Sequence, residues 1–347
     1  WLWPSAQAEG ALCSCPVTAE ALAEALHALA QQGNTPFGVY VTSPDYLGGV
    51  QDIPALAAVC RAQGVPLLVD NAHGAYLRFL PQNCHPIAQG AAMCCDSAHK
   101  TLPVVTGGAY LHLAHDAPVQ DEAAVRGALA LFGSTSPSYL ILQSLDACNA
   151  VLAGDYPRRL AQCCAALEGL RRSLNKATAA RQCPVPLAVA GVQQEPMKLT
   201  LDAAALGCTG TALAEALRRA QLECEYADPR YVVLMFTPEN PPQDFERLQT
   251  ALEQLLAAVP AGLSRPENRA GEFAALQQQA VQRCTIRQAV LGAQVRVPVH
   301  KALGRVCAMP TVSCPPAIPV AVSGEEITPA SIVLMQRYGI EELSVLR

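Results

Sequence analysis

The stretch VPLLVDNAHG (65–74) joins a short apolar run to a carboxylate, an amide and an imidazole. The later stretch AAMCCDSAHKTLP (91–103) repeats this arrangement. Neither apolar run alternates with polar residues, so we predict two strands of a parallel sheet that is buried on both faces. Ligands of open α/β sheets bind beyond the carboxyl ends of such strands. We therefore expect one crevice to receive the side chains that follow both runs: Asp70, His73, Ser97, His99 and Lys100.

These side chains supply an acid, a ring, a hydroxyl and an amine, which together suit pyridoxal phosphate. A lysine amine forms a Schiff base with its aldehyde, and a carboxylate keeps its ring nitrogen protonated. An unpaired carboxylate at the end of a buried strand costs several kcal/mol. Asp70 therefore needs a cation, and the pyridinium would provide one. Lys100 also stands out because only four of the 24 lysine and arginine residues are lysines, and arginine cannot form a Schiff base.

The segments VDNAHGAYLRFLP (69–81) and HPIAQGAAMCCDSAHKTLPVVTGGAYLHL (85–113) resemble the core signature of the Orn/Lys/Arg decarboxylase family. The resemblance covers nearly the whole chain. It implies an α/β fold of the aspartate aminotransferase-like class, that of pyridoxal-phosphate-dependent transferases. It makes Lys100 the Schiff-base lysine and Asp70 the partner of the ring nitrogen. It also assigns Ala72 and His73 to the cofactor ring, and Ser97 and His99 to the neighbourhood of the phosphate.

The sequence departs from the family pattern once in each half of the signature. The family usually has Glu where Asn71 stands, and Gln-Thr or a similar pair where Gly107 and Gly108 stand. These departures motivate a hypothesis that the protein is a catalytically silent paralogue. An aminotransferase or a lyase of the same fold is a further alternative, because one scaffold supports several reactions.

Two loops add to the resemblance. Residues 43–48 match an S-P-x-Y-x-G turn, which we expect at the mouth of the crevice. The run STSPSY (134–139) resembles a family loop that reaches the cofactor phosphate of a neighbouring subunit, which implies that Ser134 and Thr135 bind cofactor in a homodimer or higher homo-oligomer with shared active sites. The residues alone predict a helix start in this run, with Ser136 as N-cap and Pro137 as the first helical residue.

The chain divides into three predicted parts. Residues 1–135 form part of a large cofactor-binding domain with a mainly parallel sheet, and the resemblance implies that its N-terminal portion lies upstream of this chain. Residues 136–262 form a linker helix and a small α+β domain, and residues 263–347 form a C-terminal decarboxylase domain. We predict further helices at 18–32, 52–63, 121–131, 209–220 and 242–259, and further strands at 37–41, 108–113, 197–202, 223–227 and 231–237.

Composition excludes several classes of protein. A net charge of -5 offers no electrostatic basis for binding nucleic acid, and no apolar run reaches the roughly 18 residues of a membrane helix. The 15 cysteines include no C-x-x-C pair, so we expect reduced, buried thiols in the cytoplasm. His112 and His115 form an H-x-x-H pattern, but we expect no acidic partner nearby and hence no metal site.

The resulting hypothesis is a cytoplasmic enzyme that decarboxylates a basic amino acid with pyridoxal phosphate. Lysine, arginine and ornithine all remain candidate substrates, because the side-chain pocket is not a local motif.

Overall fold

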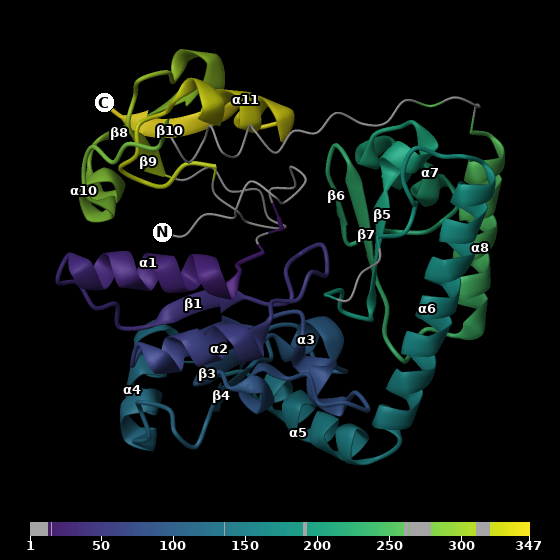
Figure 1. Ribbon diagram of the computed structural model, residues 1–347, viewed down its shortest axis with the longest axis horizontal. Coiled ribbons are helices and arrows are strands. Elements are labelled where there is room, and N and C mark those ends of the chain that lie inside the picture. Colours follow the sequence, from purple (N-terminus) through teal and green to yellow (C-terminus); the bar gives the residue numbers. More distant parts are fainter. Residues whose placement is uncertain are drawn as a thin grey trace.

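The computed structural model describes residues 13–14, 16–134, 136–189, 193–259, 263, 279–309 and 320–347. Three sheets occupy separate regions of the molecule, and the long helix α6 (Tyr156–Ala180) leads from the region of the first sheet along the outer side of the second (Figure 1). Each sheet falls within one of the three predicted parts of the chain. The boundary residues 135 and 262 lie outside the described residues, so the domain limits stay a prediction.

The first sheet has four strands in sequence order: β1 (Val39–Thr42), β2 (Leu67–Asp70), β3 (Met93–Asp96) and β4 (Tyr110–Leu113). The first three strands are parallel, and β4 joins the edge antiparallel to β3. Helices α1 (Ala19–Gln31) and α2 (Ile53–Ala62) pack together over this sheet. Buried leucine, isoleucine and valine side chains of both helices and of β1 and β2 form one apolar cluster. The mainly parallel sheet is as predicted.

Short helices carry the chain away from the strand ends. They are η1 (Ala75–Phe79) after β2, η2 (Pro86–Gln89) before β3, and α3 (Ala98–Thr101) after β3. Three longer helices follow β4 in the chain: α4 (Glu122–Phe132), α5 (Tyr139–Ala153) and α6 (Tyr156–Ala180).

The predicted cap of α5 is wrong. Ser138 is the N-cap, and its hydroxyl accepts from the backbone N–H of Ile141 at 3.5 Å. Ser136 lies in a separate turn, where its N–H donates to the hydroxyl of Ser134 at 3.1 Å. The local turn of the two serines therefore displaces the helix start by two residues.

The second sheet is antiparallel, with the order β5 (Lys198–Asp202), β7 (Tyr231–Met235), β6 (Tyr226–Ala227). Only two residues of the predicted strand 223–227 are in the sheet. Helices α7 (Gly210–Arg219) and α8 (Pro242–Ala257) and the turn η3 (Ala203–Leu206) surround it. Helix α8 lies beside α6 (Figure 1). Leucines of α6, α7 and α8 share a core with β5 and β7, and this core continues to Ala98 and Leu102 beside the first sheet.

The third sheet, also antiparallel, has the order β8 (Gln294–Pro298), β10 (Glu342–Leu346), β9 (Cys307–Met309). Helices α10 (Ile286–Leu291) and α11 (Pro329–Arg337) and the turn η4 (Val299–Lys301) accompany it. Its buried residues form a core of their own. Across the described residues, no helix combines the length and the apolar character that crossing a bilayer requires.

Candidate active site

The carboxyl ends of β2 and β3 lie side by side. Asp70 is in register with Cys95, and the backbone N–H of Asn71 donates to the carbonyl of Cys95 at 2.9 Å. Thr42, the last residue of β1, is in register with Asp70 on the other side. The polar residues that follow these strands therefore emerge at one edge, as the parallel arrangement predicts.

Lys100 and His73 meet at this edge. The Lys100 Nζ lies 3.2 Å from the His73 Nε2. Lys100 sits on α3, where its backbone N–H donates to the carbonyl of Ser97 at 3.0 Å, and its side chain is exposed. His73 follows β2 by three residues and is only 5 % exposed. The structure thus brings the amine of one strand end against the imidazole of the other.

The surroundings of His73 keep its imidazole neutral. Burial lowers the pKa of His73 to about 2, assisted by the positive charges of Lys198 and Lys100. The ring of Tyr46 meets the His73 ring edge-on, with centroids 5.0 Å apart. The Nδ1 of His73 is buried and has no hydrogen-bond partner among the described residues. An ammonium at Lys100 would accordingly donate to Nε2, and the other ring nitrogen remains unsatisfied.

Asp70 is held by neutral donors. The Tyr40 hydroxyl donates to its Oδ2 at 3.0 Å, and the Ala72 N–H donates to its Oδ1 at 3.1 Å. Burial, followed by the charge of Asp70, raises the pKa of Tyr40 above its ordinary value. Within the described part of the chain, no lysine, arginine or histidine forms an ion pair with Asp70. The carboxylate at the end of β2 is therefore oriented but not neutralised.

The other predicted site residues divide into two groups. Ser97 is the N-cap residue of α3 and is half-buried, and its side chain makes no capping bond. His99 is half-buried, and burial together with the Lys100 charge lowers its pKa. Both lie beside Lys100 in sequence. Ser134 is exposed and hydrogen-bonds within its own turn, and Thr135 lies outside the described residues.

Lys198, a buried lysine that the motifs did not single out, holds the loop next to His73. The Lys198 Nζ donates to the carbonyls of Asp45 and Tyr46 at 2.8 and 3.3 Å, and lies 5.4 Å from the centre of the Tyr46 ring. Lys198 therefore ties β5 to the loop that places Tyr46 against His73. The loop that carries Tyr46 therefore lies beside His73, and its place at the mouth of a cofactor crevice stays a prediction. The scarcity of lysine in the sequence is a signal that pointed to Lys198 as much as to Lys100.

Glu195 completes this buried group. The Tyr76 hydroxyl and the Met197 N–H both donate to its Oε2, the latter at 2.8 Å. Burial raises the pKa of Glu195 to about 7, and the Lys198 charge opposes that rise. The Arg171 guanidinium donates to the Pro196 carbonyl at 2.9 Å. An acid and two cations are thus enclosed where the second sheet meets the loop beside β1.

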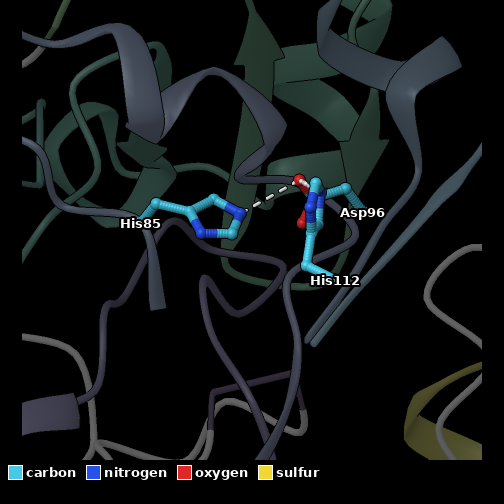
Figure 2. A group of neighbouring side chains, drawn as sticks. All are labelled: His85, Asp96 and His112. Carbon is cyan, nitrogen blue, oxygen red and sulfur yellow. Dashed lines mark hydrogen bonds and ion pairs between the residues drawn. The ribbon is translucent and has the colours of Figure 1, made fainter. Parts of the chain in front are cut away.

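The expectation that His112 has no acidic partner is wrong. The Nε2 atoms of His112 and His85 lie 3.0 and 3.1 Å from the same Oδ2 of Asp96 (Figure 2). Antiparallel pairing explains the contact, because His112 is in register with Cys94, two residues before Asp96. His115 of the H-x-x-H pattern is exposed.

The two departures from the family pattern fit their surroundings. The Asn71 Nδ2 donates to the Oδ1 of Asp96 at 2.7 Å, whereas a glutamate at position 71 would put a second carboxylate against Asp96. Gly107 has a φ of +99°, which favours glycine. A Cβ at Gly108 would overlap the side chain of Val104. The local packing accounts for all three residues.

The chain is similar in sequence and in fold to known amino acid decarboxylases. Residues 1–193 match the family model described as Orn/Lys/Arg decarboxylase, major domain. Two Bacillus subtilis relatives are the uncharacterized protein YaaO, 29 % identical over 86 % of this chain and 61 % of its own, and arginine decarboxylase, 28 % identical over 85 % and 60 %. The Escherichia coli constitutive lysine decarboxylase superposes with a TM-score of 0.71 at 18 % identity, covering 100 % of this chain and 63 % of that one.

The fold is of the aspartate aminotransferase-like class, which the structural likeness to decarboxylases and aminotransferases confirms. Within it, because the family model matches more than half of the chain, this protein belongs to the Orn/Lys/Arg decarboxylase family. The chain spans about three fifths of the length of the curated relatives it matches.

Proposed function

We propose that the protein decarboxylates a basic amino acid, one of lysine, arginine and ornithine, with pyridoxal phosphate as cofactor. The observation that carries the proposal is the contact between the Lys100 amine and the His73 imidazole at the strand edge where Asp70 ends β2. Membership of the family supports the reaction class, and the arginine decarboxylase relative supports a basic substrate.

The residues present fit this cofactor. Asp70 is a carboxylate without a cationic partner in the described chain, His73 has an unsatisfied buried nitrogen, and Lys100 offers an exposed primary amine. Lys100 would hold the aldehyde carbon and Asp70 the ring nitrogen. Ala72 and His73 would contact the ring, and Ser97 and His99 would lie near the phosphate. When bound, pyridoxal phosphate supplies an electron-accepting ring that stabilises the electron pair left by a departing carboxylate.

Asp70, His73 and Lys100 would each have a different part in the proton transfers. The charge of Asp70 favours a proton on the ring nitrogen. Because its pKa is low, His73 stays neutral and accepts from Lys100 through Nε2. Lys100 and His73 are the two candidates for carrying a proton to the substrate Cα, and the contact in which a neutral His73 accepts from Lys100 favours Lys100. Tyr46, held by Lys198, keeps the His73 ring in place.

The proposal includes a homodimer or larger homo-oligomer in the cytoplasm. Helix α4 buries none of its residues in the single chain. Leu131, Phe132 and Tyr139 are 78, 93 and 83 % exposed and flank Ser134 and Thr135. If a second subunit covers this apolar surface, Ser134 and Thr135 of the first subunit would reach the cofactor site of the second. The described cysteines, 13 in number, are all free thiols, in keeping with a reducing compartment.

The test begins with expression of the complete reading frame. The purified protein should show a visible cofactor absorbance that borohydride abolishes, and should release carbon dioxide and the corresponding amine from one of the three substrates. Lys100→Ala should abolish both signals, whereas Lys176→Ala, at an exposed position on α6, should retain them. Formation of a keto acid instead of an amine would indicate an aminotransferase. No visible absorbance, or absorbance without any product, would indicate a catalytically silent paralogue.

A further inference from the structure

Two imidazoles, those of His85 and His112, face the carboxylate of Asp96 at the end of β3. His85 lies just before η2, Asp96 ends β3, and His112 is on β4 (Figure 2). We propose that His85, Asp96 and His112 form a binding site for a divalent transition-metal ion, with zinc as the best match. This proposal is independent of the proposed function, because it concerns residues other than those assigned to the cofactor.

The spacing of the three ligand atoms suits coordination. The two Nε2 atoms lie 3.1 and 3.0 Å from the Oδ2 of Asp96, and all three atoms lie within 4.8 Å of one another. Zinc binds nitrogen and carboxylate oxygen at about 2.0–2.1 Å. An ion at that distance from Oδ2 and from either nitrogen would subtend an angle of about 95° between them. At tetrahedral angles each nitrogen–oxygen separation would be about 3.4 Å, a few tenths of an ångström longer than the present ones.

The carboxylate is oriented by groups that leave one oxygen for the ion. The Oδ1 of Asp96 accepts from the Asn71 Nδ2 at 2.7 Å and from the Cys94 thiol at 3.2 Å. Both histidines face Oδ2. Hydrogen bonds to the distal oxygen of a ligand are a common feature of metal sites, because they fix the ligand in place.

Burial also suits a metal site with one open position. His85 and Asp96 are buried, whereas the His112 side chain is 39 % exposed. Solvent on the His112 side gives an ion its route of entry and can supply a fourth ligand, as in zinc sites with three protein ligands. Binding through Nε2 places the His85 ring proton on Nδ1. The 3.1 Å hydrogen bond from Nε2 to the Asp96 Oδ2 and the long 3.4 Å contact with the Ile87 N–H are then given up in exchange for bonds to the ion.

The ion would have a stabilising effect on the active-site edge. The three ligands come from the segment before η2 and from two neighbouring strands, and Ser97 to Lys100 follow Asp96 directly. An ion that joins these segments would fix the strand end from which Lys100 emerges. Asn71, one residue after Asp70, would couple the same ion to the end of β2.

The test uses untagged protein that has been freed of metal with a chelator and then dialysed against zinc ion alone. We expect a tightly bound zinc ion in each chain, together with a raised thermal unfolding midpoint. Cobalt in place of zinc should give the visible absorption of a site with histidine ligands. His112→Gln should lose this ion, its midpoint shift and the cobalt band. His115→Gln, which alters the exposed histidine three residues away, should retain all three.

His112 is partly exposed, so its substitution is not expected to prevent folding, and circular dichroism will verify this. The variant comparison also separates this site from adventitious binding by the many cysteines. Zinc content, midpoint shift and cobalt spectrum that are the same in wild type and in His112→Gln would overturn the proposal. So would a wild-type protein that binds no zinc.

Discussion

The Lys100 Nζ lies 3.2 Å from the His73 Nε2, although the two residues are 27 positions apart in the sequence. Each follows a buried parallel strand, and the pairing of β2 with β3 brings the two strand ends together. The contact places a primary amine against an imidazole whose pKa burial has lowered. This pair is the centre of the proposed active site, and its chemistry leads to measurable consequences.

The first prediction concerns the stability of the folded chain in acid. The pKa of His73 is about 2 in the folded protein, below its ordinary value of 6.5. Below about pH 6.5 the unfolded chain therefore binds a proton that the folded chain does not, and the free energy of unfolding decreases by up to about 1.4 kcal/mol per pH unit. Urea unfolding should show that His73→Gln removes about 2 kcal/mol of this loss between about pH 6.5 and pH 5.

His27→Gln is the control, since His27 is exposed on α1. It should leave the acid dependence of the wild type unchanged. Parallel pH profiles for wild type and His73→Gln would contradict the buried, neutral imidazole.

The second prediction concerns Glu195, whose contribution to the free energy of unfolding falls as the pH rises, whereas that of His73 falls as the pH decreases. Burial raises the pKa of Glu195 from 4.5 to about 7, so the folded chain holds a proton that the unfolded chain has already released. This contribution is fully present below about pH 4.5 and is lost as the pH rises through about 7. Relative to wild type, Glu195→Gln should gain stability by a few kcal/mol between about pH 5 and pH 8. Urea unfolding at several pH values will measure this gain, and the exposed control Glu253→Gln should show none.

The third prediction concerns Lys198. Its side chain is 3 % exposed and its Nζ donates to the carbonyls of Asp45 and Tyr46. Methionine matches the apolar stem of lysine as far as Cε but cannot donate, and it removes the charge that opposes the rise in the pKa of Glu195. Lys198→Met should therefore lower the free energy of unfolding by about 3 kcal/mol. Lys176→Met, at an exposed site on α6, should stay within about 0.5 kcal/mol of wild type. Equal stability of the two variants would show that the buried amine does not hold the loop.

The fourth prediction addresses assembly. Phe132, at the end of α4, is 93 % exposed in the single chain. If it lies in a subunit interface, Phe132→Glu would bury an unpaired charge there and should reduce the mass in sedimentation to that of a monomer. Val333→Glu, which changes a 49 % exposed residue of α11, should leave the mass as in wild type. A monomeric wild type would refute the shared active sites.

Local sequence patterns predicted the parts of the fold that depend on neighbouring residues. The apolar runs that end at Asp70 and Asp96 are strands, and Thr18 caps α1 through the Ala21 N–H at 3.1 Å. The parallel arrangement then sufficed to predict that the residues after both strands lie at one edge of the sheet, where Lys100 contacts His73. These features follow from hydrophobic periodicity and helix capping, which act over a few residues.

Contacts between distant segments could not be predicted in this way. Lys198 and Asp45 are 153 positions apart, and no local pattern indicates that β5 packs against the loop after β1. The role of His112 was misjudged for a related reason, since its partner Asp96 comes from the neighbouring strand. One signal was available: like Asp70, Asp96 ends a buried strand, and such a carboxylate requires polar partners.

The most direct measurement is the site of covalent cofactor attachment. The complete protein is loaded with pyridoxal phosphate, reduced with borohydride, digested and analysed by mass spectrometry. The account predicts that the reduced adduct lies on Lys100 and on none of the other three lysines. An adduct on Lys198 or another lysine, or no adduct at all in protein that has folded, would contradict it.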